Sequence, residues 1–244
     1  MTRRSSICIS TSRRSDARQT TGHRHLRWLL ILVVFQLSLF SASAQGFLKF
    51  QRDSIPFFRG FAVSADLVGL AQMQLGDYGQ YEAALRLNLH DQYFPIVELG
   101  LGRANHQDDE VTHISYKTSA PYFRVGADVN IAKNKHAKNR IYAGLRYGYT
   151  SYKVDIDREP FEDPYWKTMT TYNINDRQCS QHWAEILFGI EAELVGPLHL
   201  GWSVRYRNRL SNDDGGIGKT WYVPGYGTQD TSNLGFTFNV IVDI

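Results

Sequence analysis

The chain has 244 residues, with 27 Lys and Arg against 24 Asp and Glu and a formal net charge of +3. Seven of the basic residues but only one acid lie within residues 1–44, so the rest of the chain carries a net charge of −3. A mildly acidic chain lacks the concentrated basic face of a nucleic-acid binder, so we expect no nucleic-acid partner. The length is ordinary for one barrel or sandwich domain.

The N-terminus has the pattern of a secretory signal peptide. Residues 1–27 are rich in arginine, residues 28–40 are mainly apolar, and Ala42-Ser43-Ala44 follows. The apolar stretch is shorter than the ~20 residues that a membrane-spanning helix needs, so an anchor is the weaker interpretation. We predict cleavage after Ala44, followed by a periplasmic lead-in over residues 45–57.

Eight later segments alternate between apolar and polar residues with a period of two, as half-buried strands do. They span residues 61–67, 81–89, 97–101, 123–131, 141–149, 184–194, 198–206 and 234–242. None of the eight apolar faces carries a charged residue. The opposite faces carry Asp66, Glu82, Arg86, Glu98, Arg124, Asp128, Arg146, Glu185, Glu191, Glu193, Arg205 and Arg207.

In a membrane barrel the apolar face meets lipid and the polar face lines the interior, whereas a soluble barrel has the reverse arrangement. With the export signal, the pattern predicts an all-β fold: an eight-stranded antiparallel up-and-down transmembrane β-barrel over residues 58–244. Short connections at 90–95, 132–140 and 195–197 alternate with long ones at 70–79, 102–120, 150–181 and 208–232. This alternation is typical of bacterial outer-membrane barrels, in which the long loops face outward.

An eight-stranded barrel is only wide enough for side chains to fill it, so the inward charges should pair with one another. The predicted lumen charge network is Arg86, Glu98, Arg124, Asp128, Arg146, Glu185, Arg205 and Arg207. The expected turn positions place Arg86 opposite Glu98, Glu185 opposite Arg207, Glu193 opposite His199, and Asp128 diagonal to Arg146. An ion or proton path through these charges is the alternative interpretation.

Three further segments contain chemically capable side chains. Residues 105–113 hold two His and several acids without a defined metal-loop spacing, so a solvated acidic loop is expected there. Ser180, His182 and Glu185 are close in sequence, which is insufficient for a hydrolytic triad because triads are defined by geometry. Residues 215–220 lack the glycine spacing of a phosphate loop. We predict no catalytic, cofactor-binding or metal-binding residue.

Several short sequence segments resemble a family of small outer-membrane β-barrel proteins of Bacteroidota whose function is unknown. They are Pro56–Phe61, Gly76–Glu82, Phe94–Gly100, Tyr122–Gly126 and Ile141–Tyr147. The resemblance implies the barrel fold and the outer-membrane location, and it brings no functional residue with it. The terminal Ile244 differs from the terminal Phe that is common in other outer-membrane barrels.

The expected function is that of a small OmpA-like outer-membrane barrel with a filled, charged lumen. Its role would be membrane-structural or one of surface contact, without catalysis. Expected partners are outer-membrane lipids, the barrel-assembly machinery, and a surface ligand or partner at the long loops. The alternatives are a lipid-modifying enzyme of the outer membrane and a small pore or transport accessory.

Overall fold

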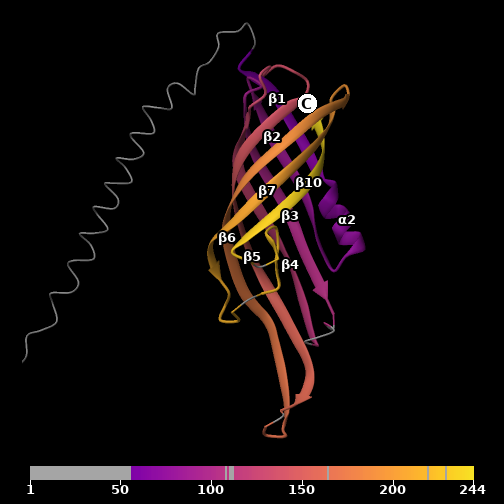
Figure 1. Ribbon diagram of the computed structural model, residues 1–244, viewed down its shortest axis with the longest axis vertical. Helices are drawn as coiled ribbons and strands as arrows, with labels where there is room; N and C mark the ends of the chain where they lie inside the picture. The colour runs from indigo at the N-terminus through magenta and orange to yellow at the C-terminus, as the bar shows by residue number, and fades with distance from the viewer. Residues whose placement is uncertain (1–55, 108, 110–112, 164, 219, 229) are drawn as a thin grey trace, which may run out of the picture. The chain divides into compact units, whose positions relative to one another are not determined.

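The computed structural model describes residues 56–244, except for positions 108, 110–112, 164, 219 and 229. The predicted signal peptide and residues 45–55 of the predicted lead-in lie outside the described residues. The described chain forms a closed antiparallel barrel in which strands adjacent in the ring are joined in the order β1-β10-β7-β6-β5-β4-β3-β2 (Figure 1). The predicted eight-stranded up-and-down topology is therefore confirmed.

Strands that are consecutive in the chain are neighbours in the barrel, and β10 closes the ring by pairing with β1. They are β1 (Phe58–Asp66), β2 (Tyr78–Leu89), β3 (Tyr93–His106), β4 (Ile114–Asn130), β5 (Arg140–Glu162), β6 (Met169–Val195), β7 (Leu198–Asp213) and β10 (Ser232–Asp243). A helix, α2 (Leu67–Leu75), separates β1 from β2. The connection between β7 and β10 contains a small two-stranded sheet of β8 (Tyr222–Val223) and β9 (Gly227–Thr228).

The alternation in sequence becomes an alternation in burial. Along β6, for example, Leu187 is buried whereas Ile186 and Phe188 are 60% and 51% exposed. Successive strand side chains point to opposite faces, so one face of the wall is apolar and exposed and the other is polar and enclosed. In the part of the chain that is described, no helix is long and apolar enough to cross a membrane.

The two ends of the barrel differ. Phe61 and Ile244 exchange backbone hydrogen bonds of 3.1 and 2.7 Å, which places the start of β1 beside the C-terminus. We call this the terminal end. At the opposite end β5 and β6 continue well beyond the other strands, as Figure 1 shows, and we call it the hairpin end.

The predicted loops at the hairpin end are largely strand. Residues 102–120 and 150–181 were expected as irregular connections, but β5 and β6 pair as far as Glu162 opposite Met169. The inward row continues as Tyr152, Val154 and Ile156, whereas outward positions such as Lys153 are polar. The prediction failed because it recognised a strand only where the outward residues are apolar. Beyond the apolar wall β5 and β6 remain paired strands, but their outward residues are polar.

Helix α2 corrects a second prediction. Leu67 was placed on the first strand and residues 70–79 in a loop, whereas Leu67 begins the helix. The Asp66 carboxylate accepts hydrogen bonds from the backbone N–H groups of Val68 and Gly69, both at 3.1 Å. A side chain that satisfies free N–H groups at a helix start is an N-cap, so Asp66 ends the strand and begins the helix.

The turn between β2 and β3 corrects a third. His90 and Asp91 have φ values of 59° and 54°, a left-handed pair typical of a tight hairpin turn. The register that follows places Arg86 opposite Ile96 and Ala84 opposite Glu98. The predicted turn centre at Gln92 was one residue too late, so the predicted pairing of Arg86 with Glu98 is wrong.

Candidate functional site

The middle of the lumen is organised around Arg124, whose side chain is fully buried on β4. Its guanidinium forms ion pairs with Glu98 at 2.8 Å, with Glu185 at 3.2 Å and with Glu82. These three carboxylates come from β2, β3 and β6, so a single arginine joins strands from around the barrel. A guanidinium presents several donors in a fixed plane and suits such a multiple contact.

Glu98 is the acidic counterpart of Arg124. It accepts hydrogen bonds from Arg205 at 2.8 and 3.2 Å and from Arg146 Nε at 3.1 Å. Arg146 also holds Asp128 through two bonds of 2.7 and 2.8 Å. The register places Asp128 and Arg146 two residues out of alignment on neighbouring strands, the diagonal arrangement expected from the sequence.

Glu185 and Arg207 lie opposite each other in the β6–β7 register, as do Glu193 and His199. Glu185 contacts Arg207 at 3.4 Å and accepts a hydrogen bond from Trp183 at 2.7 Å. Glu193 instead binds Lys138 at 2.7 Å on the surface. All eight residues of the predicted network therefore face the lumen, although several contact partners that lie across the barrel.

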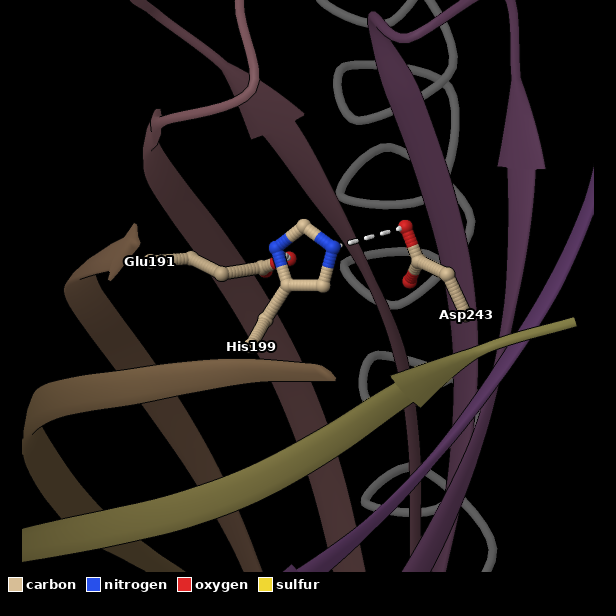
Figure 2. Close-up of side chains that lie close together, drawn as sticks. All are labelled: Glu191, His199 and Asp243. Carbon is tan, nitrogen blue, oxygen red and sulfur yellow. Dashed lines mark ion pairs between the residues drawn. The ribbon is translucent and has the colours of Figure 1, made fainter. Parts of the chain in front are cut away.

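A second ionic cluster closes the terminal end. Glu191 binds Arg86 at 2.7 Å and Arg140 at 2.7 Å, and Arg140 also binds Asp243 at 3.0 Å. The His199 ring stands between the two carboxylates, 3.4 Å from Glu191 and 3.4 Å from Asp243 (Figure 2). The position that the sequence had assigned to Glu98 as partner of Arg86 is thus taken by Glu191.

Glu191, His199 and Asp243 are the group among the described residues whose ligand atoms could reach one cation, since these atoms lie within 4.8 Å of one another. The neighbouring charges do not fit such an ion. Two guanidinium groups already neutralise the two carboxylates, and a divalent cation would be placed beside both. The geometry is that of a salt-bridge cluster with a histidine inserted.

The space left between these side chains is small. A cavity lies among Arg86, Glu98, Asp128, Arg146 and Arg205. The volume that the centre of a water molecule can occupy within it is about 20 Å³. About 10–15 Å³ of such volume holds one water. The cavity therefore has room for a water or two and is too small for a conducting column of solvent.

The hairpin end of the lumen is closed by a different device. Residues 221–226, which we call the plug, fold back into the barrel, and Tyr222, Val223 and Tyr226 are almost completely buried. Tyr116 donates a hydrogen bond of 2.7 Å to the carbonyl of Tyr222, and Arg207 donates one of 2.8 Å to the carbonyl of Tyr226. The side chains of Tyr222, Val223 and Tyr226 therefore pack inside the barrel, although residues 208–232 were expected as a long connection.

Two glycines allow the plug to approach the wall. A Cβ at Gly225 would lie 2.4 Å from the Tyr122 ring, and one at Gly102 would lie 2.7 Å from the Cα of Pro224. Gly225 also has a φ of +80°, a conformation that side chains disfavour. Around the plug gather the buried apolar residues Ala104, Tyr116, Ala120, Tyr122, Tyr152, Val154, Ile156, Cys179 and Trp183.

The acidic segment at residues 105–113 contributes a contact at the rim. His106 Nδ1 lies 2.7 Å from Asp77 and Nε2 lies 3.5 Å from Asp109. The hydrogen bond to Asp77, with the nearby negative charge, raises the pKa of His106. The His106 ring stacks on Trp221 with centroids 5.0 Å apart. Positions 108 and 110–112 of this segment lie outside the described residues.

The Ser180, His182 and Glu185 neighbourhood is not a triad. Glu185 points into the lumen and is completely buried beneath Arg124, whereas His182 lies on the outer face with its Nδ1 2.6 Å from the Tyr147 hydroxyl. Residues an odd number apart on one strand face opposite sides. The motivation for the lipid-modifying enzyme is thereby removed.

Sequence reasoning missed Arg140, Asp243 and Tyr122 as members of the ionic site. Arg140 shares the even-numbered inward row with Tyr142 and Arg146, and Asp243 continues the odd-numbered inward row of β10. Extending each predicted strand by one residue would have found both. Tyr122, which donates a 2.6 Å hydrogen bond to Glu82, could be placed by the same alternation.

A domain family described as being of unknown function, DUF6048, has a model that matches residues 25–243. The chain belongs to this family. The match spans nearly the whole chain and includes every residue of the two ionic clusters and of the plug. The DUF6048 barrel has no match among curated proteins.

Solved structures similar to the DUF6048 barrel include Neisserial surface protein A, at 11% identity and a TM-score of 0.42, covering 77% of this chain and 99% of that one. Ail, the attachment invasion locus protein of Yersinia pestis, shows 11% identity and a TM-score of 0.36, covering 75% and 93%. A major outer membrane protein from Thermus thermophilus shows 15% identity and a TM-score of 0.40, covering 76% and 98%. None of these similarities transfers a function to this chain.

Proposed function

We propose that this protein is an outer-membrane barrel with a closed lumen that acts as a membrane-embedded platform for surface contact. The observation that carries the proposal is that the barrel wall has an apolar outer face and a polar, enclosed inner face. The outer face is a continuous apolar wall, with Leu99, Leu145 and Phe236 each more than 60% exposed. A face of this kind is stable against hydrocarbon and is a liability in water.

The closed interior favours a non-conducting barrel. The ionic clusters fill the middle and the terminal end, and the plug fills the hairpin end. A small pore would require both to move. Catalysis finds no support, because the one candidate triad is divided between the two faces of β6.

The feature best placed for contact is the β5–β6 hairpin beyond the barrel. Its tip exposes Tyr165, Trp166 and Met169 at 81%, 73% and 68% of their surfaces. Exposed aromatic side chains are enriched where proteins meet partners. The surface ligand or partner that the sequence placed at several long loops is accordingly proposed for this hairpin alone.

The expected orientation puts the terminal end in the periplasm and the hairpin end outside the cell. Membrane lipids and the barrel-assembly machinery are then its partners, and signal-peptide cleavage after Ala44 precedes insertion. The sequence resemblance supports a source among the Bacteroidota. These statements remain predictions.

Two measurements test the platform. Electrophoresis of the outer-membrane fraction with and without boiling should show a mobility shift, because folded barrels resist SDS. Planar bilayers containing the purified protein should show no channel of porin size. Steady porin-sized conductance would refute the closed lumen, and an unshifted protein in the soluble periplasm would refute the membrane location.

Surface contact has its own test. Asp157 pairs with Asn173 in the β5–β6 register, so deleting residues 158–172 shortens the hairpin without changing its register. We expect the variant to keep its mobility shift while producing cells lose adhesion to one another or to a solid support. Unchanged adhesion would remove the contact role and leave a purely structural one.

A further inference from the structure

The barrel wall has a break between β10 and β2. Strand β1 pairs with β10 from Ala62 to Asp66, and with β2 no further than Ala65 opposite Ala83. Beyond that point, residues 232–238 of β10 and 78–82 of β2 have no β1 residue between them. At the hairpin end the wall therefore lacks the strand that would join its two edges.

Helix α2 lies on the outside of the barrel wall (Figure 1) and contacts both edges of the break, β2 and β10. Asp66, its N-cap, also accepts a hydrogen bond of 3.3 Å from the backbone N–H of Phe238 on β10. Open strand edges are avoided in hydrocarbon because their backbone groups stay unsatisfied. We therefore interpret α2, which has its own N-cap and contacts both edges, as a structural part of the barrel wall.

Two glycines fix how closely the helix lies on β2. A Cβ at Gly79 would stand 2.4 Å from the backbone nitrogen of Met73, and one at Gly69 would stand 2.6 Å from the carbonyl oxygen of Gln80. The helix backbone thus rests directly on β2. On the side of β10 the helix leaves a gap.

That gap is an open groove of about 520 Å³, lined by Leu67, Val68, Ala71, Gln72, Leu75, Gly76, Tyr78 and Phe238. No lining residue is charged, and the whole helix carries no charged residue. Phe238 is the middle member of the outward apolar row of β10, which runs from Leu234 to Val242. The groove is therefore continuous with the apolar wall.

We propose that this groove binds one acyl chain of a membrane lipid, and the proposal rests on the membrane location proposed above. At the depth of Phe238 the surrounding medium is hydrocarbon, so the available occupant is an acyl chain. The volume lies within the ~300–1,000 Å³ typical of small-molecule sites. The groove lies on the hairpin-end side of the wall break, which the orientation proposed above places toward the outer leaflet, so the chain is one of lipid A.

The test is native mass spectrometry of the detergent-purified full chain titrated with dipalmitoyl phosphatidylethanolamine and, separately, with lipid A. We expect a one-to-one adduct with lipid A and a weaker one with the phospholipid. Ala71→Trp should fill the groove and lower the adduct fraction about tenfold. Ala127→Trp is the matched control, because Ala127 faces outward on β4 between two paired strands and should leave the adduct unchanged.

Phe238→Ala removes the β10 side of the groove and gives a second reading should Ala71→Trp fail to fold, which the mobility shift reports. Equal adducts in all variants, or none in the wild type, would overturn the acyl-chain site and leave general lipid contact only. A protein without a mobility shift would instead overturn the membrane location itself. An adduct with the phospholipid alone would overturn lipid A as the source of the chain.

Discussion

The two halves of the lumen are filled in different ways. From the middle to the terminal end the strands bring together arginines and carboxylates, with Arg124 and Glu191 at the centres of the two clusters. At the hairpin end the same strands carry aromatic and aliphatic residues, and the plug supplies the matching surface. The space inside such a barrel can therefore be filled by ion pairs between opposite strands or by an apolar segment that folds into it.

The two halves also differ in which parts of the chain they need for their packing. The ionic half is complete within the strands, because each charge finds its partner on another strand of the same ring. The apolar half depends on residues 221–226, and the wall beside it depends on α2. We therefore expect the ionic half to set the stability of the barrel and the hairpin end to be the part that can move.

Arg124→Met is the strongest test of this comparison. It removes a buried guanidinium that contacts Glu82, Glu98 and Glu185 together, and removing one partner of a buried ion pair costs about 3–5 kcal/mol. The free energy of unfolding, measured by urea titration of the refolded barrel, should fall by that amount. Arg103→Met, on an exposed side chain of β3, should change it by less than about 0.5 kcal/mol. Equal stability of both variants would show that the ionic half is not the stable one.

Gly225→Ala tests the plug. The new methyl group would meet the Tyr122 ring at 2.4 Å and would occupy a left-handed conformation. Gly216→Ala shares the left-handed conformation, at φ +84°, but meets nothing within 4 Å. The Gly225 variant should therefore be less stable than the Gly216 variant by about 1–3 kcal/mol, the usual cost of overpacking.

The plug variant has a second, local readout. Cys179 is 1% exposed and belongs to the apolar cluster around the plug. If the plug is displaced in Gly225→Ala, a maleimide reagent should label Cys179 faster than in Gly216→Ala. Identical labelling rates would mean that the apolar half keeps its packing without close contact from residue 225.

Asp66→Ala tests the covered wall break. It removes the N-cap of α2 and the acceptor for the Phe238 N–H, and loss of such a cap costs about 0.5–2 kcal/mol. Amide hydrogen exchange should accelerate in residues 67–75 and leave the ionic half unchanged. Acceleration throughout the barrel would show that the wall break and the ionic half form one cooperative unit.

The sequence was sufficient for the fold because strand alternation is a local property. Which residues face outward follows from parity alone, and residues as distant as Val63 and Val242 obey it. Strand ends were less accessible. Beyond the apolar wall β5 and β6 continue with polar outward residues such as Lys153, and an apolar criterion stops too early.

The partners within the lumen were less predictable. Register between neighbours gave Glu185 with Arg207, but Arg86 finds Glu191 across the barrel, a contact set by curvature and side-chain length. The plug was missed for another reason. Tyr222 and Tyr226 look like loop aromatics in sequence, and only the cross-barrel space at the hairpin end decides that they turn inward.

The smallest expected effect concerns pH at the rim of the apolar half. The bond to Asp77 raises the pKa of His106, so its stabilising contribution is complete below the ordinary histidine pKa of about 6.5 and is lost as pH rises through the higher folded value. Because both side chains are partly exposed, the contribution should stay below about 1 kcal/mol. An NMR titration of the His106 ring should show a lower pKa in Asp77→Asn than in the wild type. An unchanged His106 would mean that Asp77 does not hold the rim beside Trp221, and that the hairpin end relies on the plug alone.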